Sequence, residues 1–350
     1  MPRSPAPRCA ILVLNYNGQD LLERHLPSVV EAARPEGHRV VVVDNDSRDG
    51  SGQVARDLGA EFMPTGGNRF MLGLNQAARA VDADVVVTLC NDVTVAPDCF
   101  GYLLESFAHP RVFGVTCKTY WVEDRSTLQF ARVTGRFAGG LVDPVYLLEH
   151  LEEPDSPGPR PTLYGTGGST AWRRSTFLEL GGFDPLLFPL YGEDVDLSYS
   201  GWRRGWITLY DPRAVVYHQD SVTVGRTQRP GWSDRVKLRN RYLLAWKNLG
   251  DPALLIRSLR SWAWELRSTR APENRWKLRP LLEALARMPR ALARRWQLPP
   301  AVVPDREILP ELLPGRIRSG LGRGTPFPGD LWDFPPTPTR GGPPPREGTA

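Results

Sequence analysis

The chain has 350 residues, of which 41% are hydrophobic and 24% are charged, and its formal net charge is +5. These values are ordinary for a soluble globular protein of about two domains, and no apolar run approaches the roughly 18 uncharged residues that a membrane-spanning helix needs. The four cysteines include no CxxC pair, and the first apolar stretch is too short for a signal peptide, so we expect a cytoplasmic protein without a disulfide framework or a zinc knuckle.

Residues 8–92 alternate apolar runs with helical patterns. The segments CAILVLNYN, RVVVVDNDS and DVVVTLCND predict strands that are buried on both faces, because polar residues gather at their ends. The segments GQDLLERHLPSVVEAA, SGQVARDLGA and GLNQAARAVDAD predict helices. This order predicts an α/β fold with a mainly parallel central sheet, in which ligands collect at the carboxyl ends of the strands.

Residues 113–218 are less regular. They include the acidic, proline-rich segment EEPDSPGPRP, the small-residue run YGTGGSTAWRR and the carboxylate-rich segment YGEDVDLSYSGWRRGW. The segment ITLYDPRAVVYHQD follows and predicts one further strand.

The composition changes after Leu249. Residues 251–297 hold eleven Arg or Lys against four Asp or Glu, with four tryptophans interleaved. The second half of this segment predicts an amphipathic basic helix with an apolar face of Leu278, Leu281, Leu285, Met288, Leu292 and Trp296, and a basic face of Arg287, Arg290 and Arg294. Three interpretations fit such a helix: packing against the preceding domain, peripheral binding to an anionic membrane and, least favoured, binding to nucleic acid.

These changes divide the chain into four predicted regions. Residues 8–250 form the globular domain, and residues 251–298 form a basic helical extension. Residues 1–7 and 299–350 are expected to be disordered, and proline and glycine dominate the latter.

Three common fingerprints are absent from the sequence. It has no GxGxxG after the first strand, no GxxxxGK[ST] and no GxSxG. The usual dinucleotide oxidoreductases, P-loop nucleotidases and serine hydrolases therefore lack support, and carboxylates, amides and one histidine are the remaining candidates for chemistry.

Carboxylates close two of the predicted strands. Asp44 ends the second strand and is followed by Asp46 and Asp49, a turn that suits either a nucleotide pocket or an ordinary helix cap. Asp92 ends the third strand and His218 ends the last. Together they could hold a divalent metal, although a lone histidine at a strand end is more often structural.

Glu193, Asp194 and Asp196 crowd one short segment. Like charges this close raise at least one pKa, which can poise a carboxylate as a base near neutral pH. The alternative is a solvated helix start that the helix dipole favours.

The ordered motifs NYNG, VVVVDNDSRDGS, LCNDV, GGFDPLLF, YGEDVDLSYSGWRRGW and VVYHQDS resemble those of the family 2 glycosyltransferases with the GT-A fold, particularly the bacterial rhamnosyltransferase-like branch. The resemblance spans about residues 8–248. It implies inverting, metal-dependent transfer of a hexosyl or deoxyhexosyl group from a nucleotide-diphospho-sugar to an acceptor hydroxyl, in cell-wall or polysaccharide synthesis. No clean copy of the QxxRW element of processive members is present, so transfer of a single sugar is expected.

The resemblance also implies roles for the motif residues. Asp194 would be the catalytic base with Glu193 beside it, and Asp92 and His218 would hold Mn²⁺ or Mg²⁺. The donor site would contain Asn15, Tyr16, Asn17 and Asp44 around the base, Asn91 at the ribose, and Asp46, Asp49, Asn68, Asn75, Gly167 and Gly168, with Ser169 near the acceptor or the transferred sugar.

Two positions depart from the family pattern. Cys90 stands where the family's DxD element begins with Asp or Asn, and a thiol is a poor ligand for a hard cation. Phe70 replaces the glycine that usually follows the position of Asn68. The first departure motivates one alternative function, a degenerate member that binds donor or glycan without transfer.

A second alternative is a nucleotidyltransferase, which normally has a glycine-rich basic loop where this chain has only Gly18. The expected partners of the transferase are a nucleotide-sugar donor and a glycan or lipid-linked acceptor. Residues 251–298 are expected to provide peripheral contact with the inner face of the plasma membrane, and nucleic acid is not expected as a partner.

Overall fold

The computed structural model describes residues 7–146, 158–219, 225–226 and 228–309. The predictions of disorder for residues 1–6 and 310–350 lie outside this range. Among the helices of the described part, none combines the length and the apolar character needed to cross a membrane.

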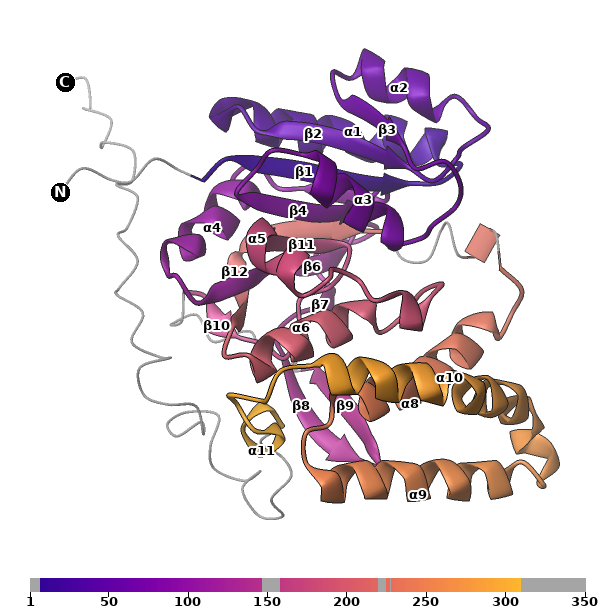
Figure 1. Cartoon of the computed structure of the whole chain (residues 1–350). Helices are drawn as coiled ribbons and strands as arrows, with labels where there is room; N and C mark the ends of the chain where they lie inside the picture. The colour runs from indigo at the N-terminus through magenta and orange to yellow at the C-terminus, as the bar shows by residue number, and fades with distance from the viewer. Residues whose placement is uncertain (1–6, 147–157, 220–224, 227, 310–350) are drawn as a thin grey trace, which may run out of the picture.

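A ten-stranded sheet runs through the centre of the molecule, and helices cover it (Figure 1). Its order is β10-β12-β6-β11-β4-β1-β2-β3, with β5 beside β12 and β7 beside β6, while β8 and β9 form a separate pair. The strands are β1 (Cys9–Asn15), β2 (Arg39–Asp44), β3 (Glu61–Pro64), β4 (Val85–Cys90), β5 (Val93–Val95), β6 (Val112–Trp121), β7 (Leu128–Phe130), β8 (Val133–Ala138), β9 (Leu141–Tyr146), β10 (Arg160–Pro161), β11 (Ser169–Arg173) and β12 (Ile207–His218).

Helices fill the connections and form the C-terminal layer. The α-helices are α1 (Gln19–Ala33), α2 (Ser51–Asp57), α3 (Leu72–Ala80), α4 (Cys99–Glu105), α5 (Arg174–Glu179), α6 (Glu193–Arg203), α8 (Trp232–Asn248), α9 (Pro252–Ser268), α10 (Leu278–Gln297) and α11 (Asp305–Ile308). The 3-10 helices are η1 (Arg34–Glu36), η2 (Ser106–Ala108), η3 (Pro185–Leu187) and η4 (Pro272–Lys277).

The predicted α/β fold is confirmed, and the first four strands of the sheet, β1 to β4, are parallel. The rest of the sheet is mixed, because β11 runs antiparallel to both of its neighbours, β4 and β6. On the other side of β11, β6 and β12 are again parallel to each other and run in the same direction as β4, so the sheet is mainly parallel as predicted.

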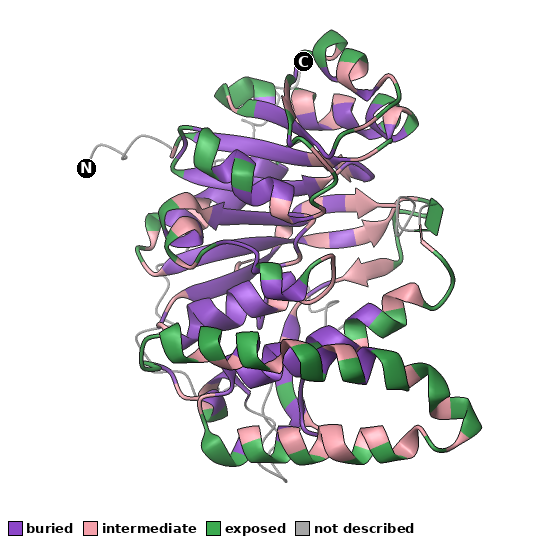
Figure 2. Cartoon of the chain, turned by 45° about the vertical axis from the view of Figure 1, so that its right-hand side comes forward, coloured by how far each residue is buried: buried purple, intermediate pink, exposed green. Residues whose placement is uncertain are grey.

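Both faces of the central strands are covered, which explains their continuous apolar runs. Ile11 of β1 belongs to the same buried cluster as Leu22 of α1. The next residue, Leu12, points to the opposite face and joins Leu74 of α3 in a second cluster. Figure 2 shows the resulting buried strands between partly exposed helices.

The C-terminal helices form a layer in which α10 packs along α8 (Figure 1). The predicted amphipathic helix is present with its apolar residues on one face, but that face is only partly buried. Leu281 is fully buried, whereas Leu278, Leu285 and Trp296 are exposed. The buried residues of α10 are Pro280, Leu281, Ala284 and Ala291, so the helix packs along the edge of its apolar face and leaves the rest exposed.

The packed chain also extends beyond the predicted boundary at residue 299. Asp305 of α11 is buried, accepts a hydrogen bond from the Tyr199 hydroxyl at 2.8 Å, and accepts another from the Asp251 N–H at 2.7 Å. Ile308 and Leu309 are buried as well. Residues 299–309 are therefore ordered, because a buried carboxylate and an apolar end anchor them to α6 and to the start of α9.

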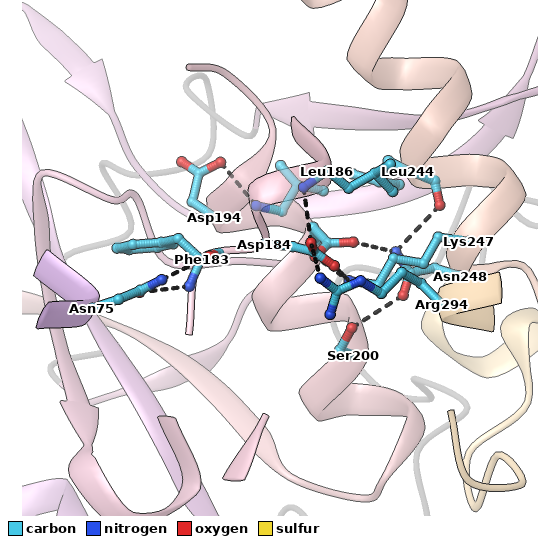
Figure 3. A network of polar contacts seen from close by, with 12 residues as sticks. Asn75, Phe183, Asp184, Leu186, Asp194, Ser200, Leu244, Lys247, Asn248 and Arg294 are labelled. Carbon is cyan, nitrogen blue, oxygen red and sulfur yellow. Dashed lines mark hydrogen bonds and ion pairs between the residues drawn. The ribbon is translucent and has the colours of Figure 1, made fainter. Parts of the chain in front are cut away.

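A buried ion cluster, which we call the lysine triad, links α8 to the rest of the domain (Figure 3). Lys247 Nζ lies 2.8 Å from Asp184 Oδ2 and 2.6 Å from Asp196 Oδ2. Burial alone would lower the pKa of Lys247, but the two carboxylates outweigh it and raise that pKa. Asn248 Nδ2 donates to the other oxygen of Asp196 at 2.6 Å, so the cluster is well supplied with hydrogen bonds.

Replacement of Lys247 by methionine tests this cluster. The change leaves two buried carboxylates without their cation, and we expect the free energy of unfolding to fall by about 3–5 kcal/mol. Urea denaturation at pH 7 measures it. Arg235→Met, at an exposed position of the same helix, is the control and should change stability by no more than about 0.5 kcal/mol. A loss below about 1 kcal/mol for Lys247→Met would show that the triad is not a structural link.

Candidate active site

Side chains from three strands meet at the carboxyl edge of the sheet. Asn15 Nδ2 at the end of β1 donates to Asp44 Oδ1 at the end of β2, at 2.9 Å. Asn91, just beyond β4, donates from Nδ2 to Asn15 Oδ1 at 2.7 Å. All three side chains are buried. The structure thus brings these three predicted donor-site residues into one polar chain.

The carboxylates of the turn after β2 have different surroundings. Asp44 accepts from the N–H and the hydroxyl of Ser47, and Asp49 accepts from the N–H and the hydroxyl of Ser51. Both therefore support the local turn, but neither Asp49 nor Ser51 is the helix cap, because Gly50 holds that position and no side chain caps α2. Asp46 is exposed with φ of +69° and has no such contact among the described residues.

The exposed loop after β1 lies beside this turn. The Asn17 N–H donates to Ser47 Oγ at 2.8 Å, and Asn17 Oδ1 accepts from the Arg48 N–H at the same distance. Tyr16 is half-buried and Asn17 is exposed. Residues 16–17 and 46–48 consequently form one rim above the buried Asn15.

Asn68 and Asn75 occupy separate places. Asn75 is buried on α3, and its amide both donates to and accepts from the backbone of Phe183, at 2.8 and 2.9 Å (Figure 3). These bonds give Asn75 a structural role, and its donor-binding role stays a prediction. Asn68 is exposed, and its Oδ1 accepts from the Phe70 N–H.

Phe70 stands where the family resemblance predicts glycine, and its backbone is left-handed, with φ of +50°. Such a φ is unfavourable for an aromatic residue. Asn45 Nδ2 donates to the Phe70 carbonyl at 3.2 Å, and the Phe70 ring meets Phe188 edge-on at 5.6 Å. These contacts hold the loop in a conformation that glycine would adopt without strain.

Asp92 and His218 form a second polar pair at the sheet edge, 3.3 Å apart between Oδ1 and Nε2. His218 Nδ1 lies 2.8 Å from Gln129 Oε1, which can only accept a hydrogen bond. The ring proton of a neutral His218 therefore resides on Nδ1, and the lone pair of Nε2 faces Asp92. Asp92 Oδ1 is buried without a hydrogen-bond partner.

This pair fits a divalent cation. The carboxylate oxygen of Asp92 and the lone pair of a neutral His218 can bind one cation between them, in place of the proton that a charged His218 would share with Asp92. Gln129 orients the ring as outer partners of metal-binding histidines do. No group of three His, Cys, Asp or Glu side chains gathers within the described residues. Two protein ligands suffice for a cation whose remaining positions are taken by water and phosphate.

Cys90 is directed at the glycine-rich loop before β11. A Cβ on Gly168 would lie 2.6 Å from Cys90 Sγ, so only glycine allows this approach. A Cβ on Gly167 would similarly meet Met71 Cε at 2.7 Å. The two glycines therefore let their loop lie against the floor of the site.

Asp194 lies in the first turn of α6. Its Oδ1 accepts from the Val195 N–H at 2.8 Å and its Oδ2 accepts from the Gly167 N–H at 3.2 Å. Burial raises the pKa of Asp194, although these two N–H groups act in the opposite sense. The surroundings of Asp194 thus raise the pH at which its carboxylate takes up a proton above that of an ordinary aspartate.

Glu193 and Asp196 differ from Asp194 in their environments. Burial, together with the charge of Asp194, raises the pKa of Glu193 well above its usual range, and Glu193 Oε2 has no hydrogen-bond partner. Asp196 faces the interior and belongs to the lysine triad. Glu193, Asp194 and Asp196 therefore have three different environments, although they lie within four residues of each other in the sequence.

A cavity of about 420 Å³ joins most of the predicted catalytic residues. Its wall includes Cys90, Gly167, Gly168, Ser169, Glu193, Asp194 and His218. Four buried polar atoms at or next to it lack hydrogen-bond partners: Asp92 Oδ1, Thr119 Oγ1, Gln129 Nε2 and Glu193 Oε2. Buried polar groups are normally paired, so this concentration indicates a site for a polar ligand.

Several residues of this cavity were missed by the sequence analysis. Tyr146 and Tyr164 share a hydrogen bond of 2.8 Å between their hydroxyls, and Lys237 Nζ lies 4.7 Å from the centre of the Tyr191 ring. Tyr191 is the first residue of the carboxylate-rich segment, and this position near Glu193 was the only sequence signal that it lines the cavity. Tyr146 and Gln129 come from the irregular segment, where spacing carries no information.

Comparison with known proteins identifies relatives of this chain. Residues 6–244 match the model of the family described as "Glycosyltransferase like family 2". The N-acetylglucosaminyl-diphospho-decaprenol L-rhamnosyltransferases of two Mycobacterium tuberculosis strains, CDC 1551 / Oshkosh and ATCC 25618 / H37Rv, are each 29% identical over 243 residues, covering 62% of this chain and 77% of the relative.

The fold is also similar to that of solved structures. GalNAc-T7 with UDP, GalNAc and Mn²⁺ aligns over 85% of this chain and 60% of its own, with a TM-score of 0.58 and 16% identity. The present chain thus spans about three fifths of that structure. The mannosyltransferase PcManGT from Pyrobaculum calidifontis, in complex with GDP-Man and Mn²⁺, aligns over 80% of this chain and 74% of its own, with a TM-score of 0.48 and 20% identity.

The environment of Glu193 predicts a dependence of stability on pH. Its raised pKa means that the folded chain holds the proton more tightly, so the free energy of unfolding falls as the pH rises between the ordinary 4.5 and the raised value. Glu193→Gln removes this loss, worth about 1.4 kcal/mol for each unit of pKa elevation. The variant should be more stable than wild type at pH 7, and the difference should shrink toward pH 4.5.

Denaturation in urea across this pH range measures the effect. Glu179→Gln, whose side chain is 60% exposed, is the control and should follow wild type throughout. A Glu193→Gln variant that is no more stable than wild type at pH 7 would contradict the burial of an uncompensated carboxyl group.

Proposed function

The chain belongs to the family 2 glycosyltransferases, and from this membership we propose that it transfers a single sugar from a nucleotide-diphospho-sugar to an acceptor hydroxyl, with inversion at the anomeric carbon and with the help of a divalent metal. The observation that carries the proposal is the cavity where Asp194 faces the loop of Gly167 and Gly168, beside the Asp92–His218 pair. The site thus brings together a candidate base, a loop that can contact the transferred sugar and a candidate metal-binding pair.

The donor nucleotide would bind at the carboxyl edge of β1, β2 and β4. The rim of half-buried Tyr16 and exposed Asn17 and Asp46 offers contacts to the base. Buried Asp44 and Asn15 hold that rim and Asn91 in position. Parallel strands of α/β folds present ligand sites at this edge. Asp49 and Asn68 would act through the loops they support.

Asp92 and His218 would hold Mn²⁺ or Mg²⁺, with Gln129 fixing the His218 ring. When bound, such a cation offsets the negative charge that develops on the departing diphosphate. Cys90 is directed toward Gly168 rather than serving as a ligand, so its thiol does not weaken the pair. This arrangement favours an active enzyme over a degenerate binder.

Asp194 would accept the proton of the acceptor hydroxyl as that oxygen bonds to the anomeric carbon and the bond to the nucleoside diphosphate breaks. Attack opposite to the leaving group inverts the configuration. The raised pKa of Asp194, caused by burial, makes it a better base than an exposed aspartate. Burial and the charge of Asp194 raise the pKa of Glu193, which disfavours a second negative charge in the cavity.

The acceptor would be a lipid-linked glycan in cell-wall or polysaccharide synthesis. The Mycobacterium tuberculosis relative is named for an acceptor in which N-acetylglucosamine is attached through a diphosphate to decaprenol. A lipid-linked acceptor also accounts for an exposed basic and apolar layer in α9 and α10, which would rest on the inner face of the plasma membrane.

Asp194→Asn tests the base. Turnover should fall by about 10²- to 10⁴-fold while donor affinity stays near that of wild type. Glu193→Gln is the matched control, because it replaces the neighbouring carboxyl group, whose raised pKa favours its protonated form, and should retain most of the turnover. Steady-state kinetics together with donor titration measure both quantities.

The pH dependence of kcat/KM gives a second test of Asp194. Activity requires the carboxylate, so it should fall as the pH is lowered through a pKa above the ordinary 3.8. Near-normal turnover in Asp194→Asn would show that another group is the base.

Gln129→Leu tests the metal pair without measuring activity. Loss of the outer partner should weaken Mn²⁺ binding by about 10- to 100-fold, and Gln129→Glu, which keeps an acceptor, should restore most of it. The amplitude of the electron paramagnetic resonance signal of free Mn²⁺ reports the binding. Gln53→Leu, at a distant exposed site, is the control. If Gln129→Leu bound Mn²⁺ as wild type does while Asp92→Ala lost binding, the role of Gln129 would be refuted and that of Asp92 would stand.

A further inference from the structure

Two adjoining hollows lie between α10 and the segments around α3 and η3, and we call them together the arginine groove. Their volumes are about 730 and 710 Å³, and both are lined by Leu72, Pro185 and Arg294. The remaining arginines of the groove are Arg69, Arg79, Arg287 and Arg290.

The groove carries a strong excess of positive charge. Arg69, Arg79 and Arg287 donate to main-chain carbonyl oxygens, which satisfy hydrogen bonds without neutralising the charge. Of these three, Arg287 also interacts with the carboxylate of Glu283. Arg294 lies 3.8 Å from Asp184, a carboxylate that already belongs to the lysine triad. Neither hollow has an acidic residue in its described lining. Planar guanidinium groups in such number match the oxygens of phosphate groups.

The floor and the outer edge of the groove are apolar. Leu186 and Phe188 line it from within. On α10, next to the arginines, an exposed apolar stripe runs along the helix, with Leu282 47% and Trp296 85% exposed. Figure 2 shows this exposed surface of the C-terminal layer. An apolar stripe beside an arginine-rich one is typical of helices that lie at a lipid surface.

The groove adjoins the catalytic cavity. Met71 lines that cavity, and the next residue, Leu72, lines both hollows of the groove. Phe188 of the groove also meets Phe70, the residue before Met71, edge-to-face. The groove and the catalytic cavity therefore lie on either side of the short segment of residues 70–72.

We propose that the arginine groove binds the diphosphate of a polyprenyl-linked acceptor, with the lipid chain leaving over the apolar stripe of α10 and the sugar directed to the catalytic cavity. The inference rests on the proposed function and deepens it, because it assigns a subsite to the acceptor. A groove lined by arginines without an acidic residue, an apolar surface beside it and a position next to the base-containing cavity are the three properties that support this assignment.

Vesicle co-sedimentation of the full chain tests the assignment. Three vesicle types are compared: phosphatidylcholine alone, phosphatidylcholine with a polyprenyl diphosphate, and phosphatidylcholine with phosphatidylglycerol at matched surface charge. We expect the polyprenyl diphosphate vesicles to bind at least about tenfold more tightly than the phosphatidylglycerol vesicles. An excess of inorganic pyrophosphate should displace the protein from the former.

The variants Arg290→Gln and Arg290→Gln/Arg294→Gln should each lose this preference, by about tenfold or more in the double variant. Arg290 is exposed on α10, so the single variant is expected to fold even if the double variant does not. Arg260→Gln/Arg267→Gln, which removes the same charge from the exposed face of α9, is the control. It should weaken binding to both anionic vesicle types alike and keep the preference for polyprenyl diphosphate.

Two outcomes would overturn the proposal: equal binding to both anionic vesicle types, which indicates a general membrane contact, or equal losses in the groove and control variants. Hydrolysis of a nucleotide-sugar by the wild-type chain is measured separately. Specific vesicle binding without any donor hydrolysis would contradict the proposed function while leaving the groove assignment intact.

Discussion

The arrangement of the site depends on the two buried ion pairs of Lys247. Lys247 lies between two buried carboxylates, and these belong to the segments that position the chemistry. Asp194 and Asp196 both lie in the first turn of α6. Asp184 caps η3, whose residues Pro185 and Leu186 line the arginine groove. One buried cation thereby fixes the distance between the proposed base, the proposed acceptor groove and the C-terminal layer. Desolvation makes such a cluster costly to break, and a single geometry satisfies all of its members.

The other fixed part of the site is the carboxyl edge of the sheet. Asn15, Asp44 and Asn91 form a buried chain of hydrogen bonds beneath the rim of half-buried Tyr16 and exposed Asn17 and Asp46. Buried amides and carboxylates are rigid only when they are paired, and here they pair with each other. Four of the buried atoms without a hydrogen-bond partner lie around Asp92 and the cavity, where a polar ligand would complete them. The division between a paired framework and an unpaired pocket is the feature expected of a site that binds charged substrates.

Much of this arrangement follows from local sequence patterns, and some of it does not. The apolar runs of β1, β2 and β4 end in the polar residues that meet at the sheet edge, so both the strands and their meeting point were predictable. The antiparallel insertion of β11 was not, because pairing between distant strands leaves no local periodicity. Gln129 and Tyr146 belong to residues 113–218, the less regular segment, whose sequence pattern did not predict their place at the site. The bond of the Asn75 amide to a backbone more than a hundred residues away was not predictable either.

The central claim is that a metal-dependent donor site lies at Asp92. A thermal-shift screen against UDP-, GDP- and dTDP-sugars, each with and without Mn²⁺, tests it most directly when Asp92→Ala is measured in parallel. The account predicts that one nucleotide class raises the unfolding temperature, and that this shift requires both Mn²⁺ and Asp92. A folded protein that no donor stabilises under any condition would contradict the account and would favour a chain that has lost the transfer function of its family.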